Sequence, residues 1–419
     1  MGLAVRVLYV VVAKDHVHVP FNDSFYFHYQ ANLLVQGKGW FINPFAYFFV
    51  DHHLVVQAAD HPPLWTLVLA IPAAVGIQGY VSQLFWGCVV GSGAVFVTGL
   101  AARRAAGPRA GLIAAGIAAV YPNYWLNDGL GMSETLVLLI VAAIILWSFR
   151  VMDQPNWSNA AVLGALCALG ALTRSELVLL LVLLIPPLVL VLRATSFRRR
   201  LVLFSVALMA ALITMAPWVG YNMARFSHTE LLSNELGVTL VCSNNRATYH
   251  GHLMGYWQGT CTTGIRTKGD ESAQDVEYRH LAFTFIDAHR SRIPAVIAAR
   301  IGRELGLFHP LGQIDLDHYL EYRPLAPAVI GLFMYYGLVL TSVAGAVVLV
   351  RRRGRPSLVP FVALLVEIVV AAAVTYGNTR FRTPVEVGLV VLTAVLANEL
   401  LDRRTGSPRG QAVAPTTGA

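Results

Sequence analysis

Long apolar stretches recur along this chain of 419 residues, and they constrain its fold more than any other feature. A helix that crosses a bilayer needs ~20 residues, and most of these stretches come close to that length. They cover residues 81–102, 110–126, 133–150, 159–173, 176–192, 201–221, 325–350, 358–376 and 384–401. Only 13% of the residues are charged, whereas soluble proteins average about a quarter. The sequence therefore predicts an all-α polytopic membrane protein.

Arginine clusters in the short loops and the tail predict how the helices are oriented. Basic residues in short loops remain in the cytoplasm, so clusters on one side mark the cytoplasmic side. The clusters are Arg103, Arg104 and Arg109; Arg193 and Arg198–Arg200; Arg351–Arg353 and Arg355; and Arg403, Arg404 and Arg409. If every stretch crosses once, all of them fall on the same side, and we expect a plasma-membrane protein with both termini in the cytoplasm. Arginines scattered between apolar stretches indicate membrane lipids as partners and argue against nucleic acid.

Two apolar segments are too short to cross comfortably. Residues 63–77 are interrupted by Pro72, so we expect an interfacial helix within the first outer loop; a short true crossing is the alternative. Residues 2–13 contain Arg6 and cannot cross alone, although the loop after them must lie outside. We therefore expect the native protein to start upstream of Met1. With that helix included, the prediction is about ten transmembrane helices.

The chain divides into two predicted regions. Residues 1–401 form the membrane domain, with a first outer loop at 14–80 and a small outer domain inserted at 222–322. Residues 402–419, rich in Pro, Gly, Ala and Thr, are predicted to be a disordered cytoplasmic tail.

Cys242 and Cys261 both lie in the outer domain, where disulfides persist. We therefore predict a disulfide between them; two free thiols are the alternative.

The first outer loop holds the candidate catalytic carboxylates, Asp23 and Asp60. Polar groups are costly inside a bilayer, so a loop rich in aspartate, histidine and aromatic residues must face water or the interface. A carboxylate can act as a general base, although ordinary surface aspartates are the alternative. His61 next to Asp60 is a weak signal for a metal, so no cofactor is indicated and a divalent metal stays an open question. Tyr26 could stack on a sugar or anchor the interface.

Three further outer-face sites carry charged residues. Arg380 and Arg382 precede the last apolar stretch, against the positive-inside trend, which favours a function over lipid contact. Arg174 and Glu176 share a tight turn and Glu134 opens a stretch; a local ion pair and a helix-dipole contact are the alternatives. Because the planar fork of arginine suits phosphate, the set predicts sugar transfer from a lipid-linked phosphate to a hydroxyl group. The residues expected to contact substrate are Tyr26, His61, Glu134, Arg174, Glu176, Arg380 and Arg382.

These motifs resemble those of the GT-C integral-membrane glycosyltransferases, the superfamily of protein O-mannosyltransferases and lipid A aminoarabinose transferases. Within it, they are most similar to those of bacterial family 39-like enzymes. The resemblance is carried by an acidic residue early in the first outer loop and by Asp60-His61-Pro62-Pro63-Leu64, Met132-Ser133-Glu134-Thr135-Leu136, Leu172-Thr173-Arg174-Ser175-Glu176, Ala216-Pro217-Trp218 and Arg380-Phe381-Arg382-Thr383-Pro384. It implies an inverting transfer of a hexosyl or pentosyl group from a polyprenyl-phosphate donor, on the extracytoplasmic face, with Asp23 as the base. Ser24 departs from the second acid or small residue of many relatives, which argues against metal assistance. The acceptor hydroxyl stays open between a glycan, a lipid and a protein.

A transporter or flippase for a lipid-linked sugar is the main alternative. Such a protein should carry charges or broken helices near the bilayer midplane. Glu367 is the one clear carboxylate deep in an apolar stretch, and the other acids cluster outside. This distribution favours an enzyme. A non-catalytic assembly subunit with the same topology is a third reading.

Overall fold

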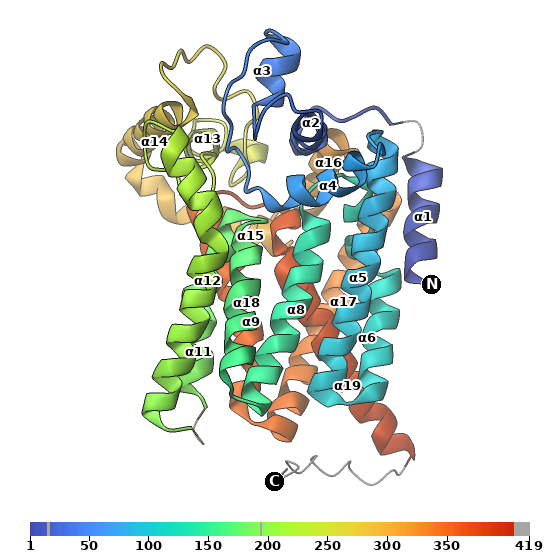
Figure 1. Ribbon diagram of the computed structural model, residues 1–419. Helices are drawn as coiled ribbons and strands as arrows, with labels where there is room; N and C mark the ends of the chain where they lie inside the picture. Colours follow the sequence, from blue (N-terminus) through green and yellow to red (C-terminus); the bar gives the residue numbers. More distant parts are fainter. Residues whose placement is uncertain (15–16, 193–194, 406–419) are drawn as a thin grey trace.

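The computed structural model describes residues 1–14, 17–192 and 195–405, and within these ranges it is helical without any named strand. The nearest approach to a sheet is an isolated antiparallel bridge between Ile42 and Gln57. Long helices run side by side as a bundle, and shorter helices gather over one end of it (Figure 1). We call this end the site end and the opposite end the arginine end. The all-α polytopic prediction is confirmed.

Within the described ranges, six helices have the length and apolar composition of a membrane crossing. They are α5 (Tyr80–Ala106), α8 (Glu134–Asp153), α12 (Phe197–Arg225), α17 (Leu325–Arg353), α18 (Val359–Val374, extended by the preceding 3-10 turn) and α19 (Thr383–Thr405). Shorter apolar helices accompany them, namely α1 (Gly2–Ala13), α6 (Pro108–Val120), α9 (Trp157–Ala171) and the run at 175–190. The number of crossings, about ten, stays a prediction.

The structure corrects three predicted boundaries. The stretch at 110–126 is not one helix, because α6 ends before Pro122 and the short α7 (Pro122–Trp125) follows. The stretch at 176–192 is split into η2 (Ser175–Leu179), α10 (Leu180–Leu183) and α11 (Ile185–Leu190), and the last break precedes Pro186 and Pro187. Proline lacks the backbone N–H that a continuous helix needs, which accounts for that break. Residues 402–405 belong to α19 rather than to a disordered tail; the rest of the predicted tail lies outside the described residues.

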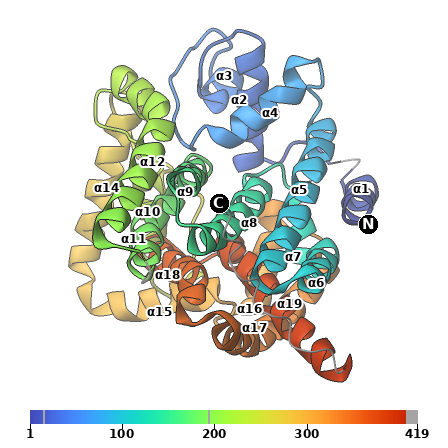
Figure 2. The same ribbon diagram turned by 60° about the horizontal axis from the view of Figure 1, so that its bottom comes forward.

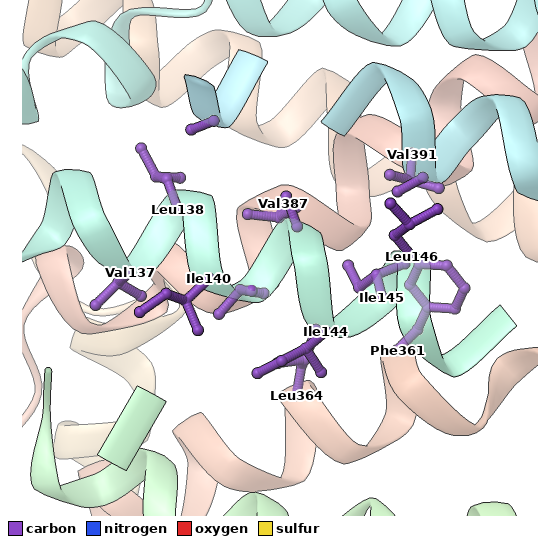
Figure 3. Close-up of a cluster of buried hydrophobic side chains, with 14 of the residues drawn as sticks. Val137, Leu138, Ile140, Ile144, Ile145, Leu146, Phe361, Leu364, Val387 and Val391 are labelled. Atoms are coloured by element: carbon purple, nitrogen blue, oxygen red, sulfur yellow. The ribbon is translucent and has the colours of Figure 1, made fainter. Parts of the chain in front are cut away.

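Helix α8 forms the centre of the bundle, surrounded by α5, α9, α18 and α19 (Figure 2). Its branched side chains meet Leu364 of α18 and Val387 and Val391 of α19 in a continuous apolar core (Figure 3). Glycines let two neighbouring pairs of helices approach closely. A Cβ atom at Gly164 of α9 would overlap the carbonyl oxygen of Ala207 in α12, and one at Gly345 of α17 would overlap that of Leu392 in α19. Small residues at such contacts are typical of helix packing in membranes.

The helix α4 (Leu64–Ala74) lies across the site end rather than alongside the long helices (Figure 1). It packs against α2 (Asp23–Val35), so these two helices of the first loop form one layer over the bundle. A helix is therefore present where the sequence predicted an interfacial one, and its N-cap is Pro63. The small α3 (Pro44–Phe49) extends this layer outward (Figure 1).

The arginine end joins the basic clusters to one another. Asp153 at the end of α8 accepts ion pairs from Arg104, with the atoms 2.7 Å apart, and from Arg353. Arg352 pairs with Glu399, and Arg199 donates to the carbonyl oxygen of Pro155, 3.0 Å away. Members of all the predicted clusters thus lie at one end, as the sequence predicted; Arg193 and Arg409 lie outside the described residues.

The segment between α12 and α17 folds over the site end as four helices, α13 (Leu236–Ser243), α14 (Glu271–Ala288), α15 (Ile293–Glu304) and α16 (Pro310–Glu321). A disulfide joins Cys242 of α13 to Cys261, the pair expected from the sequence. Both cysteines pack into a small apolar cluster with Leu240, Tyr278 and Ala282. Because α12 continues to Arg225, this outer segment begins slightly later than residue 222.

Candidate active site

Asp23 lies at the first position of α2 on the site end. Asn22 caps that helix by accepting from the backbone N–H of Ser24, 2.9 Å away, and its side-chain amide donates to the carbonyl oxygen of Leu320 in α16. These bonds fix the start of α2 against the outer segment. The side chain of Asp23 remains 24% exposed, so its carboxylate can meet a ligand from outside.

A cluster of alternating acids and arginines surrounds this carboxylate. Arg380, in the turn before α19, donates to Asp23 with the atoms 2.8 Å apart. The same guanidinium lies 3.8 Å from Glu134 at the start of α8 and 3.7 Å from Glu321 of α16. Helices that are distant in sequence therefore converge on one guanidinium.

Glu134 links Arg380 to a second arginine. Arg174, in the turn after α9, donates to the same carboxylate oxygen of Glu134 over 2.6 Å and to Glu176 over 2.5 Å. Glu134 is 1% exposed, whereas Arg174 is 18% exposed. The buried acid thus holds both guanidinium groups in place and leaves parts of them open to solvent.

The electrostatics keep Asp23 ionised. Burial of the carboxyl disfavours its charged form, but Arg380, His61 and Arg174 outweigh this and hold the pKa of Asp23 well below its usual range. The neighbouring cations therefore outweigh the desolvation that alone would raise the basicity of Asp23. Phe21, two residues before Asp23, is 70% exposed, and its ring contacts those of Phe45 and Phe49.

His61 lies on another side of Asp23 and connects it to a further acid, Glu235. Its Nδ1 lies 2.9 Å from a carboxylate oxygen of Glu235, and its Nε2 lies 3.9 Å from Asp23. Burial lowers the pKa of His61, but Glu235 and Asp23 outweigh this and raise it to about 9. The imidazole is therefore a cation near neutral pH, and its ring stacks on Phe27 with the centroids 4.8 Å apart.

Asp60 lies in a more acidic environment than Asp23. Burial and the neighbouring Glu271 raise the pKa of Asp60 well above its usual range. Glu271 itself accepts from Asn43, Asn234 and the backbone N–H of Ala59. In the described part of the chain no hydrogen bond or ion pair joins Asp60 to His61, and Glu235 is the acid that lies 2.9 Å from the imidazole.

Two other predicted residues lie apart from the exposed carboxylate. Arg382 is 3% exposed, pairs with Glu386 over 2.7 Å and stacks on the ring of Tyr335, so its guanidinium lies in the core. Tyr26 is 1% exposed, and its hydroxyl accepts from Gln30, 2.7 Å away. Its ring edge contacts His61, so it supports that side chain from behind.

Sequence reasoning missed two acids of this site, Glu235 and Glu321. Glu321 approaches Arg380 and also pairs with Arg323 over 2.7 Å. Its place near the end of the outer segment, just before an apolar stretch, was an available signal. Glu235 had no such signal, because only the folding of the outer segment over α4 brings it to His61.

The fold of this chain is that of the GT-C membrane glycosyltransferases. Two solved structures share it: the oligosaccharyltransferase AglB from Archaeoglobus fulgidus, in complex with an inhibitory peptide and a dolichol-phosphate, and apo ArnT from Cupriavidus metallidurans. The first has a TM-score of 0.55 and 15% sequence identity over 96% of this chain. The second has a TM-score of 0.57 and 15% identity over 97% of this chain. This chain spans about half the length of AglB (50%) and 60% of that of ArnT.

Residues 60–221 match the sequence profile of the dolichyl-phosphate-mannose-protein mannosyltransferase family. No curated protein sequence matches the chain. The matched region starts at Asp60 and contains Glu134, Arg174 and Glu176 of the site. The profile match, which covers fewer than half of the residues, and the shared fold agree with the resemblance that the motifs suggested.

Proposed function

We propose that this protein is an inverting glycosyltransferase that moves a sugar from a polyprenyl-phosphate donor to a hydroxyl acceptor on the extracytoplasmic face of the membrane. The observation that carries the proposal is the exposed Asp23 carboxylate held 2.8 Å from Arg380. A general base and a phosphate-binding cation are thereby side by side. The fold shared with membrane glycosyltransferases supports the same class of reaction.

In this mechanism the acceptor oxygen attacks the anomeric carbon of the sugar from the face opposite the phosphate. The hydroxyl proton passes to Asp23 as the new bond forms. The bond between the sugar and the phosphate oxygen breaks, and its electron pair remains on the phosphate. Arg380 and Arg174 hold the developing negative charge, since guanidinium groups bind phosphate through paired N–H donors.

The resting ion pair explains how the base becomes active when the donor binds. Arg380 lowers the basicity of Asp23 while the two are paired. A phosphate on Arg380 would take up part of that positive charge, so the carboxylate would become more basic only with the donor present. His61 and Glu235 keep Asp23 in position on its other side. The acceptor then enters beside Asp60 and His61, and Tyr26 supports the His61 ring from behind.

The experiment is incubation of the purified full chain with radiolabelled polyprenyl-phosphate sugars and glycan, lipid or protein acceptors. Label should move to an acceptor while polyprenyl phosphate is released, with inversion at the anomeric carbon measured by NMR. We propose that no metal takes part, so transfer should persist in EDTA. Passage of the intact donor across proteoliposomes without cleavage would instead identify a flippase and refute the enzyme.

A further inference from the structure

A pocket of about 430 Å³ lies in the outer segment, on the stretch between α13 and α14. It is lined by Arg246, Ala247, His250, Gly251, His252 and Leu253. In the described part of the chain no hydrogen bond or ion pair joins these residues to Asp23, His61 or Arg380. The pocket shares no lining residue with the candidate active site, and its polar side chains are one arginine and two histidines.

Three arginines near α15 hold this stretch in shape. Arg292 donates to the carbonyl oxygen of Tyr249 over 2.9 Å, and Arg300 donates to that of Ser243 over 2.8 Å. Arg303 donates to the carbonyl oxygen of Met254 over 2.7 Å and also to that of His252. Because backbone groups on both sides of the pocket are anchored, its lining is fixed before any ligand arrives.

Neutral oxygens, rather than ion pairs, hold the arginines around the pocket. Neither Arg246 nor the three anchoring arginines forms an ion pair anywhere in the described residues, and Arg300 is 4% exposed. Burial lowers the pKa of Arg300 to about 10, which reflects a cation held by neutral oxygens. Asp317 acts electrostatically on Arg303, and Asp287 pairs with Arg290 on the exposed face. Buried cations are usually paired, so an excess of positive charge is left here.

We propose that this pocket binds an oxyanion, the phosphate or carboxylate group of a ligand. Arg246 offers a planar fork of donors. Arg292 lies 3.4 Å from Nδ1 of His250 and donates to it, which leaves the imidazole proton on Nε2 as a further donor. The proposal does not depend on the glycosyltransferase reaction, because none of these residues belongs to that site.

Equilibrium dialysis of the full chain in a neutral detergent against radiolabelled inorganic phosphate tests the proposal. We expect saturable binding of about one phosphate per chain. Arg246→Gln and the double variant His250→Gln/His252→Gln should weaken it by ~10-fold or more each, because hydrogen bonds to charged groups contribute that much. These side chains are exposed, so their replacement should leave the melting temperature unchanged. Arg290→Gln, which removes an exposed arginine paired with Asp287, is the matched control and should bind normally.

The absence of saturable binding, or equal binding by Arg246→Gln, would overturn the proposal. A second arm identifies the natural source of the oxyanion. The dialysis is repeated in nanodiscs of phosphatidylcholine with and without phosphatidylglycerol. If phosphatidylglycerol displaces bound phosphate from the wild type, the pocket takes a lipid headgroup. If it does not, the pocket takes a water-soluble ligand. Failure here would leave the sugar-transfer assay unaffected.

Discussion

Asp23 is the residue on which the proposed chemistry depends. Asp23→Asn keeps the shape of the side chain and can still accept from Arg380, but it cannot take a proton from the acceptor. We expect turnover to fall by roughly 10²–10⁴-fold, the usual cost of losing a positioned base. Donor binding and the melting temperature should change little. Near-normal turnover in the purified assay would exclude Asp23 as the base and direct attention to Asp60.

Arg380 and Arg382 lie in the same turn but should fail in different ways. Arg380→Ala leaves Glu134 paired with Arg174 and Glu321 paired with Arg323, so we expect weaker donor binding and slower transfer with a nearly normal melting temperature. Arg382→Ala leaves Glu386 buried with Asn123 as its remaining donor, which should cost about 3–5 kcal/mol of stability. Donor-binding titrations and thermal melts on both variants separate the two roles. Equal loss of stability in both variants would contradict this division.

The raised pKa of His61 makes a pH-dependent contribution to stability. The folded-state pKa is about 9 and the ordinary value is 6.5. The contribution is therefore fully present below pH ~6.5 and is lost as the pH rises through ~9. Its size is ~1–3 kcal/mol, kept small because Glu235 is 41% exposed.

Thermal melts of wild type and His61→Gln between pH 6 and 10 measure this contribution. The two melting temperatures should differ most at pH ~6 and converge at pH ~10. Glu235→Gln should show a smaller difference from wild type with the same pH trend. A difference between wild type and His61→Gln that grew with rising pH would reverse the sign and reject the assignment.

At the level of residues, the sequence located most of the charged cluster but did not predict which of its residues pair with one another. Asp23, Glu134, Arg174 and Arg380 could be selected because each is a charge at the outer edge of an apolar stretch, where a membrane protein has few reasons to keep one. Glu235 could not be selected, because its contact with His61 exists only after the outer segment folds over α4. Arg382 followed the same rule as Arg380, yet it lies two residues further along the same 3-10 turn, and its side chain is directed into the core.

Among the elements, α13 and α14 depend on the disulfide. Cys242 and Cys261 close a loop with a sequence separation of 19, and such a cross-link stabilises a fold by ~3 kcal/mol. In the double variant Cys242→Ser/Cys261→Ser we expect hydrogen exchange in residues 236–288 to speed up by ~100-fold, which is that energy expressed as an opening equilibrium. Exchange in α8 should not change. Thiol labelling of both cysteines in unreduced wild type would show that the bridge is absent in the protein.

The elements also show where periodicity and length stop being informative. Helix α4 was predictable because Pro72 and its short apolar run left no room for a crossing. The division of the run at 175–190 into short helices was not predictable, because its composition is almost uniformly apolar. The last break comes just before Pro186 and Pro187. The four-helix arrangement of the outer segment depends on contacts between its helices and the bundle. These contacts join residues far apart in the chain, and no repeat in the sequence predicts them.

For the whole molecule, the central prediction is that the site end faces outward and the arginine end faces the cytoplasm. A cysteine placed at Gly79, exposed between α4 and α5, should react with a membrane-impermeant maleimide on intact cells. A cysteine at Gln154, exposed beyond α8 at the arginine end, should react only after permeabilisation. The native free cysteines, Cys88 and Cys167, are buried and give a low background. The opposite labelling pattern would invert the orientation.

The shared carboxylate at the arginine end has a thermodynamic consequence. Asp153 receives both Arg104, from the end of α5, and Arg353, from the end of α17. Each arginine competes with the other for one negative charge, so the loss of either strengthens the remaining pair. The contributions of Arg104 and Arg353 to stability are therefore non-additive. The ends of α5, α8 and α17 are energetically coupled through Asp153.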